Sequence, residues 1–260
     1  MDVSFAQANA FVASLMWPFM RISAMLIAMP VLGTRLVPTR IKIITTMVLS
    51  VFVLPLLPDM PSVEPLSLPG LVISFQQILI GLAMGFTLQL VFGALMIAGE
   101  AIAMTMGLGF ASMIDPTNGV SVPVISQFFM IVGTLLFLAL GGHLMLIQLL
   151  INSFQSLPVA ELGIDRHGFW SIVSWGSQMF IGAIWVAIPA LICMLVITLA
   201  MGVMTRAAPQ LNIFSVGFPV TMFMGFVILI LMLPGFLPRF SQMLLEAMQL
   251  SQSLVRVPIP

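Results

Sequence analysis

The chain has few charged residues, a single cysteine and no tyrosine. Of its 260 residues, 6% are charged and 61% are hydrophobic, whereas soluble domains carry roughly 25% charged residues. A soluble fold would therefore have too few charged side chains to cover its surface. The formal net charge of +0 also excludes the basic surface typical of nucleic-acid-binding proteins. These shortages predict an integral membrane protein with no nucleic-acid partner.

The scarcity of reactive side chains limits the chemistry that the chain could perform. Cys193 is the single cysteine, so a disulfide within the chain is excluded, and its apolar surroundings predict a buried, inert thiol. His143 has no Cys, His or carboxylate neighbour at metal-ligand spacing, and His167 lies in the polar stretch 161–168. The sequence contains no nucleophile elbow, HExxH motif, P-loop or dinucleotide fingerprint. We therefore expect no metal, no cofactor and no enzyme activity.

Long apolar runs dominate the remainder of the chain. About six can be compared with the roughly 20 residues that span a bilayer as a helix: 11–32, 43–57, 71–98, 124–151, 170–203 and 213–237. Pro189 is expected to bend the fifth run. The tail 241–255 instead carries a polar stripe at helical spacing, formed by Gln242, Glu246, Gln249 and Ser253. Apolar residues lie largely opposite this stripe, so the tail is predicted to be an amphipathic helix at a membrane surface or against a partner.

The third apolar run contains glutamines and glycines at every fourth position, namely Gln77, Gly81, Gly85, Gln89 and Gly93. Steps of four residues keep these positions on one face of a helix. Gly81 and Gly85 form a small-xxx-small contact that allows another helix to approach closely. The face favours dense helix packing, with a solute pathway as the alternative.

Residues 104–123 are irregular and yet apolar. Glycines and prolines interrupt the backbone at Gly107, Gly109, Pro116, Gly119 and Pro123. The apolar side chains are Met104, Met106, Phe110 and Met113. Lipid cannot satisfy the free N–H and C=O groups of such a segment, so it must be buried in protein or line a cavity. The pattern predicts a gate, a plug or a re-entrant loop.

Two charged residues accompany the apolar runs. Arg21 lies inside the first run, where it could pair with an acid, but capping of backbone carbonyls or snorkelling is favoured. Glu100 follows the third run, and an acid near hydrocarbon is a functional candidate. A helix-end carboxylate at the membrane surface is the alternative for Glu100.

Several motifs, taken in order, resemble the FliR/SctT family of type III export-gate R subunits. The stretch 107–116 reads GLGFASMIDP, 141–143 reads GGH, 153–158 reads SFQSLP and 206–214 reads RAAPQLNIF. The following residues 217–219, GFP, favour the flagellar branch over the virulence injectisome branch. The resemblance covers essentially the whole chain.

The resemblance implies an all-α integral membrane protein of long kinked helices and helical hairpins, packed in a helical gate. It implies a P-subunit-like part, 1–180, with a plug loop at 104–123, and a Q-subunit-like hairpin, 181–260, with the join near 170–189. The implied partners are P and Q subunits, FlhB-type and FlhA-type export components, unfolded flagellar proteins and membrane lipid. The implied location is the inner membrane at the flagellar basal body, with part of the assembly projecting toward the periplasm.

The resemblance also assigns roles to individual residues. The plug candidates are Met104, Met106, Gly107, Gly109, Phe110 and Met113. Flexible methionines and one aromatic ring would form a dry, deformable seal, so deletion of 107–113 should leave an assembled but leaky gate. Arg21, Glu100 and Arg206 are predicted to pair with charges on other subunits.

Three other functions stay open at this point. An injectisome SctT-type gate subunit would share the same motifs. A small-solute secondary transporter would need midplane acids or broken helices at matching positions of two halves, and the sequence offers one irregular segment without a matching one. An intramembrane enzyme would need a polar catalytic cluster, and we find no convincing one.

Overall fold

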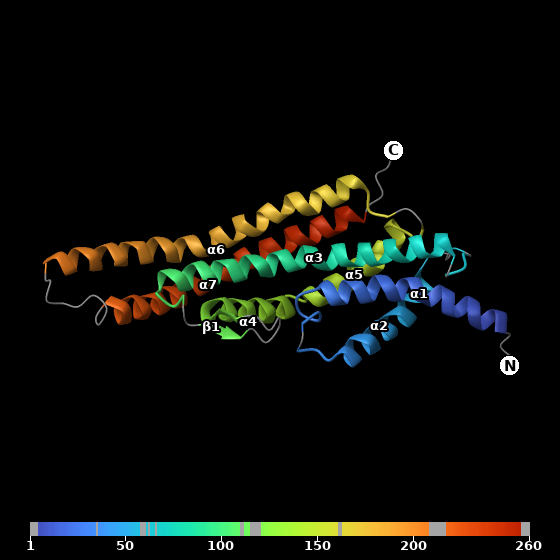
Figure 1. The fold of residues 1–260 in the computed structure, drawn as a ribbon, viewed down its shortest axis with the longest axis horizontal. Coiled ribbons are helices and arrows are strands. Elements are labelled where there is room, and N and C mark those ends of the chain that lie inside the picture. The colour runs from blue at the N-terminus through green and yellow to red at the C-terminus, as the bar shows by residue number, and fades with distance from the viewer. Residues whose placement is uncertain are drawn as a thin grey trace. The chain divides into compact units, whose positions relative to one another are not determined.

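The computed structural model describes residues 5–34, 36–57, 61, 63–65, 67–109, 112–114, 121–160, 163–207 and 217–255, and these are mostly helical (Figure 1). The helices are α1 (Phe5–Ala28), α2 (Thr39–Val53), the 3-10 turn η1 (Leu54–Leu56), α3 (Leu68–Thr105), α4 (Val124–Ala139), α5 (Gly142–Ser156), α6 (Arg166–Ala207) and α7 (Phe218–Leu254). Two three-residue strands, β1 (Ser112–Ile114) and β2 (Ser121–Pro123), pair antiparallel with Met113 opposite Val122. The predicted all-α membrane class is confirmed.

Four of the described helical segments are long and apolar enough to cross a membrane: Thr39–Leu56, α3, α6 and α7. α4 and α5 would supply a fifth if the two are counted as one broken span. The apolar run predicted over 124–151 is divided into two helices, because Gly141 adopts a left-handed φ of +69° between them. Glycine reaches this conformation at no steric cost, so the helix ends there.

Side chains at the starts of two long helices satisfy backbone N–H groups that no helical carbonyl reaches. The Ser67 hydroxyl accepts a hydrogen bond from the Gly70 N–H at 3.2 Å, at the beginning of α3. The Asp165 carboxylate accepts one from the Gly168 N–H at 2.7 Å, at the beginning of α6. Both are N-cap bonds, and the carboxylate also interacts favourably with the helix dipole.

The predicted amphipathic tail is the last part of α7, which continues through Pro234 and Pro238 to Leu254. Along this part the side chains of Gln249 and Ser253 are exposed, whereas those of Leu244 and Ala247 are buried. The polar stripe therefore lies outward, as expected for an amphipathic helix.

Contacts within the chain define two compact units, each assembled from segments that are distant in sequence. Unit 1 comprises Met1–Leu90, Gly141–Trp175 and Leu245–Pro260. Unit 2 comprises Val91–Leu140 and Gly176–Leu244. The division into 1–180 and 181–260 stays a prediction, and both units include residues on either side of residue 180.

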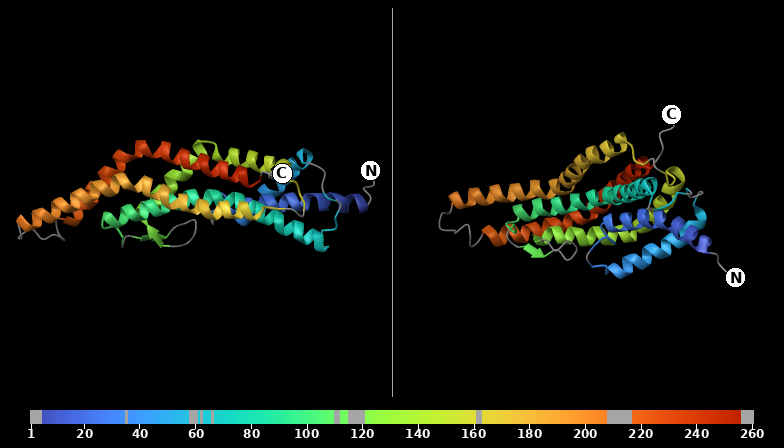
Figure 2. Two further views of the ribbon diagram at one scale, coloured as in Figure 1. Left: turned by 90° about the horizontal axis from the view of Figure 1, so that it is seen from above. Right: turned by 45° about the vertical axis from the view of Figure 1, so that its right-hand side comes forward.

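In unit 1, α1 packs beside α2, as the two views of Figure 2 show, and also against the first part of α3. Trp17 of α1 is fully buried, and its indole N–H donates to the Ser74 hydroxyl of α3 at 3.2 Å. A buried indole N–H needs such a partner, so this bond fixes the two helices against each other.

In unit 2, five phenylalanines form the core between α3, α4 and α7. They are Phe92, Phe129, Phe137, Phe236 and Phe240. The Phe92 ring packs edge-on against Phe137 at 6.1 Å and against Phe240 at 6.0 Å, between ring centroids. Such edge-to-face contacts add to the stabilisation from area burial. The Ser126 hydroxyl of α4 donates to the Met96 carbonyl at 3.0 Å, where Gly99 allows α3 and α4 to approach closely.

Cys193 lies on an exposed part of α6, so the prediction of a buried thiol is wrong. Ile192 and Leu195 beside Cys193 are exposed as well, whereas Met194 is buried, so this part of α6 presents one apolar side outward.

Candidate gate segment and helix-packing sites

The helix that leads into the predicted plug segment ends in a defined cap. Gly107 has a φ of +78°, and its N–H donates to the Met104 carbonyl at 3.2 Å. The Leu108 N–H donates to the Ala103 carbonyl at 2.9 Å. These two bonds form a Schellman motif, with glycine at the position that requires a left-handed backbone. Gly107 is therefore part of the cap that ends α3.

Met106 and Gly107 attach the end of α3 to α7 within unit 2. The Met106 side chain is fully buried and fills the space over Gly225, where an added Cβ would lie 2.6 Å from the Met106 Cε. A Cβ on Gly107 would lie 3.1 Å from the Phe218 ring. Met106 and Gly107 therefore hold the start of the predicted plug segment against α7, and neither presents a side chain to a pore.

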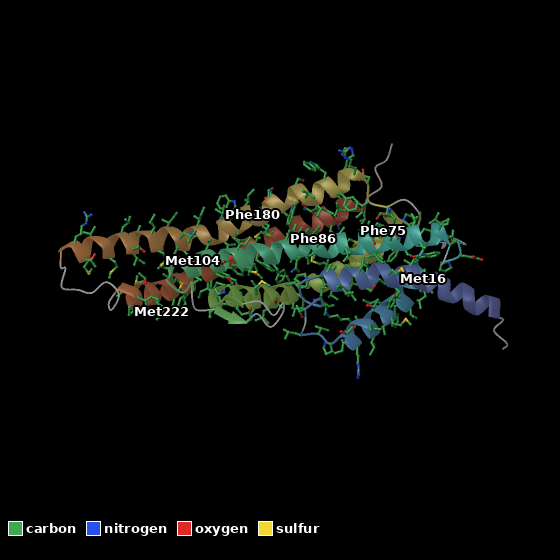
Figure 3. The ribbon with its side chains drawn as sticks, in the orientation of Figure 1. Met16, Phe75, Phe86, Met104, Phe180 and Met222 are labelled. Carbon is green, nitrogen blue, oxygen red and sulfur yellow. The ribbon has the colours of Figure 1, made fainter. Side chains whose placement is uncertain are left out.

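Met104 differs from Met106 in that 64% of its surface is exposed, and it is labelled in Figure 3. Its sulfur lies over Gly109, where a Cβ would collide with it. Phe110 lies outside the described residues, and Met113 is placed in β1 without a described side chain. Of the six plug candidates, Met104 is the one whose described side chain is largely exposed.

We expect the two methionines to respond differently to truncation. Met106→Ala would leave a cavity over Gly225, and buried methionine truncations cost about 2–5 kcal/mol. Met104→Ala should change stability by less than about 0.5 kcal/mol, because the side chain is exposed. Thermal unfolding of the purified protein in detergent would measure both changes. Equal losses of stability would contradict the assignment of Met106 as the anchor.

The predicted Gln/Gly face of α3 packs against other helices in two places. In unit 1, a Cβ on Gly81 would collide with the Arg21 carbonyl of α1, and one on Gly85 would lie 2.6 Å from the Ala28 Cβ. In unit 2, a Cβ on Gly93 would lie 2.8 Å from the sulfur of Met179 in α6. Gln77 is fully buried and Gln89 is half-buried. The structure thus places this face against other helices of the chain.

Arg21 is fully buried inside unit 1 and is bonded to α3 and to the end of α5. Its Nε donates to Gln77 Oε1 at 2.7 Å, one Nη to the Ser153 carbonyl at 3.0 Å and the other to the Leu157 carbonyl at 3.0 Å. Its guanidinium also lies 4.1 Å from the Phe154 ring centroid. The last carbonyls of a helix carry partial negative charge, so they attract this cation.

The three predicted inter-subunit charges occupy different environments. The Arg21 guanidinium caps carbonyls of its own chain, which matches the capping alternative and does not favour pairing across a subunit boundary. Glu100 of α3 and Arg206, in the last turn of α6, are exposed. For these two residues, pairing with another subunit stays a prediction.

Sequence reasoning missed the partners of Arg21. Ser153, Phe154 and Leu157 belong to the motif at 153–158, which carried the family resemblance without a physical role. The signal that could have suggested them is the serine and proline at a helix end, where free carbonyls are available for a cation.

These features define the class of the protein: an all-α integral membrane protein with several apolar helices and an irregular apolar segment anchored at a helix end. Within the described part of the chain, no cluster of three or more His, Cys, Asp or Glu residues could hold a metal ion.

Comparison with known proteins then gives the family. The family model "Bacterial export proteins, family 1" matches residues 12–247. The chain is 40% identical to flagellar biosynthetic protein FliR of Pectobacterium carotovorum subsp. carotovorum, over 89% of this chain and 88% of that protein. It is 35% identical to FliR of Escherichia coli (strain K12), over 92% and 91%, and 34% identical to FliR of Aquifex aeolicus (strain VF5), over 87% and 88%. The chain belongs to the FliR family of bacterial export proteins, and the predicted resemblance is confirmed.

Family membership and the apolar helices place the chain in the bacterial inner membrane, as a component of flagellar biosynthesis and export. As an export component it belongs to an apparatus of several proteins.

Proposed function

We propose that the chain is a structural channel subunit of the flagellar type III export gate, and that the segment 104–123 closes the pore when no protein is passing. In this proposal the chain assembles with P and Q subunits and contacts FlhB-type and FlhA-type components. Unfolded flagellar proteins pass through the gate, and the chain itself catalyses no reaction.

The observation that carries the closing role is the anchored end of α3. Met106 and Gly107 are fixed on α7 by close packing, whereas Met104 beside them is exposed. The cap at the end of α3 thus gives the irregular apolar segment a fixed base. Such a segment suits a seal that yields to side chains of different size, because methionine adapts its shape without specific hydrogen bonds.

Deletion of 109–113 tests this role more sharply than deletion of 107–113, because Gly107 and Leu108 form the cap of α3. We expect the shortened chain to be recovered with its partner subunits in normal amounts, while the membrane becomes permeable to small ions. Ion permeability would be measured in cells that express the assembled gate, with a membrane-potential dye.

A matched control replaces 109–113 with five glycine and serine residues, which keeps the length and removes the apolar side chains. Leakage in both variants would assign the seal to the apolar side chains, and leakage in the deletion alone would assign it to segment length. Unchanged ion permeability in both variants would overturn the plug assignment, even if flagellar export were lost.

A further inference from the structure

A groove in unit 2 lies between α6 and α7 and has one charged residue at its border. Its volume is about 260 Å³. The lining combines apolar residues with one arginine and includes Trp185, Leu231, Met232, Gly235, Phe236 and Arg239. Of the described residues that line it, Arg239 alone is charged, and its guanidinium lies 4.8 Å from the centroid of the Trp185 ring. We call this hollow the arginine groove.

Both helices have an uncharged stretch that ends at the groove. α6 carries no charged residue over 185–203, and α7 carries none over 218–237. Each stretch contains about 20 residues and therefore extends about 30 Å as a helix, which is the thickness of the hydrocarbon core of a bilayer. The two stretches together form an apolar band of membrane thickness.

Trp185 and Arg239 mark the same end of this band. The two helices are antiparallel here, because Gly182 of α6 approaches Met243 of α7, and Trp185 approaches Arg239. Tryptophan and arginine anchor helices where hydrocarbon meets the lipid headgroups. Polar residues reappear just beyond this level on both helices, namely Ser177, Gln178, Ser241 and Gln242. The composition of both helices therefore assigns the arginine groove to the edge of the hydrocarbon.

The two threonines inside the band have hydrogen-bond partners on their own helices. The Thr198 hydroxyl donates to the Met194 carbonyl at 2.8 Å, and the Thr221 hydroxyl donates to the Phe218 carbonyl at 3.0 Å. A hydroxyl bonded in this way can face lipid without leaving a free donor. The side chains of the band are thus compatible with hydrocarbon.

The Arg239 guanidinium offers hydrogen-bond donors to an anion. Its side chain is exposed, and the Trp185 ring contacts the guanidinium through a cation–π interaction. The N–H groups of a guanidinium lie in its plane, so a ring over its face leaves them available. No carboxylate is among the described residues that line the groove. A phosphate at this position would receive charge-assisted hydrogen bonds from Arg239.

The apolar part of the groove extends from Arg239 into the band. Nothing lies within 4 Å of the Cβ that Gly235 lacks, so the chain leaves this space unfilled. Leu231 is 74% exposed and lies two helical turns from Arg239, about 12 Å along the axis. The groove therefore presents a cation at the edge of the hydrocarbon and an apolar path that runs inward from it.

We propose that the arginine groove binds an anionic phospholipid, with its phosphate on Arg239 and one acyl chain over Gly235 and Leu231. A free phosphate would use the guanidinium and leave the apolar path empty. A carboxylate of another protein would also satisfy Arg239, but a phospholipid joins an anion to a hydrocarbon chain in the order that the groove presents. None of the described lining residues belongs to the predicted plug segment, and the inference does not depend on the proposed function.

The test uses the full chain, purified from its host in mild detergent with the export subunits that accompany it. Native mass spectrometry would count the lipids retained after addition of phosphatidylglycerol, or of phosphatidylcholine with the same acyl chains. Phosphatidylglycerol should be retained more, because choline neutralises the phosphate charge of the other lipid. Arg239→Gln should weaken its binding about fivefold, the factor that one basic residue contributes at an anionic surface. Arg239→Lys should restore part of this loss.

Gly235→Leu tests the apolar path separately from the charge. The added side chain would take the place of about two methylene groups of the acyl chain and should weaken binding about 10-fold. The matched controls are Arg166→Gln, at an exposed arginine, and Gly202→Leu, at a glycine with nothing within 4 Å of its Cβ. Neither control residue lines the groove, so both variants should bind phosphatidylglycerol normally. Arg239 and Gly235 are exposed, so their variants should be recovered in normal amounts.

Any of four results would overturn the inference. They are equal retention of the two lipids by the unaltered protein, undiminished phosphatidylglycerol binding by Arg239→Gln, undiminished binding by Gly235→Leu, and release of the bound lipid by inorganic phosphate at equal concentration. A photo-crosslinking amino acid at Leu231 gives an independent measurement in cells. It should form a product with lipid, and a product with another protein alone would assign the groove to a polypeptide and overturn the inference as well.

Discussion

Replacement of Arg21 by methionine should prevent stable accumulation of the protein in the membrane. Methionine keeps the apolar length of the side chain but removes the donors to Gln77, Ser153 and Leu157. The Ser153 carbonyl still accepts a hydrogen bond from the Leu157 N–H, whereas Gln77 Oε1 and the Leu157 carbonyl lose their donor. Each buried acceptor left without a partner costs about 1–3 kcal/mol, so the total loss should be at least about 2 kcal/mol. The amount of tagged protein in the membrane fraction, and the unfolding temperature of what can be purified, would measure the loss.

Two further variants separate the geometry of Arg21 from its charge. Arg21→Lys keeps a cation but has one compact donor group in place of a planar fork, so it should restore only part of the accumulation. Arg166→Ala removes an exposed arginine in the same unit and should have little effect. If Arg21→Met accumulated as well as the wild type, the bonds from Arg21 would be dispensable for folding.

Substitution of Gly81 or Gly85 by leucine should separate α1 from α3 and cost about 3 kcal/mol or more. Even a Cβ at Gly81 collides with the Arg21 carbonyl, and one at Gly85 lies 2.6 Å from the Ala28 Cβ, so backbone atoms would have to move. Overpacking alone costs about 1–3 kcal/mol. Displacement of α1 would also stretch the Arg21–Gln77 hydrogen bond, and the weakening of this bond would add to the loss of stability. Thermal unfolding in detergent, with crosslinking of α1 to α3 through introduced cysteines, would detect both effects.

Gly202→Ala is the matched control for the two glycine variants. Gly202 also lies inside a long helix, but nothing lies within 4 Å of the Cβ that alanine would add. Because alanine is the better helix former, this change should be neutral or stabilising by up to about 1 kcal/mol. Equal destabilisation by Gly202→Ala and Gly81→Leu would mean that close packing of α1 on α3 is not the cause.

The apolar runs predicted where the helices lie, but they did not predict where every helix ends. The run over 124–151 is mostly apolar on both sides of Gly141 and Gly142, although such a glycine pair is itself a turn signal. Gly141 adopts the left-handed conformation that separates α4 from α5, and nothing lies within 4 Å of the Cβ that it lacks. Similarly, Cys193 was expected to be buried because its neighbours are apolar, yet in a membrane protein an apolar stretch can face outward.

In the candidate sites too, features set by neighbouring residues could be predicted, whereas features set by distant segments could not. The irregular segment and the Gly81–Gly85 contact follow from glycine spacing alone. The difference between Met104 and Met106 does not, because residues two positions apart on a helix face different sides and only the position of α7 decides which is buried. The carbonyl partners of Arg21 lie 132 and 136 residues further along the chain, beyond the reach of any local pattern.

That separation has a consequence for how the protein is made. A ribosome adds about 5–20 residues per second, so Arg21 is synthesised roughly 7–27 s before Ser153 and Leu157 exist. Of the residues that accept hydrogen bonds from the Arg21 guanidinium in the finished protein, only Gln77 is synthesised before this interval ends. Unit 1 is complete only when the residues from Leu245 onward have been added. The earliest helix of the chain therefore reaches its final packing late, because two acceptors of the Arg21 guanidinium and the last segment of unit 1 are synthesised after it.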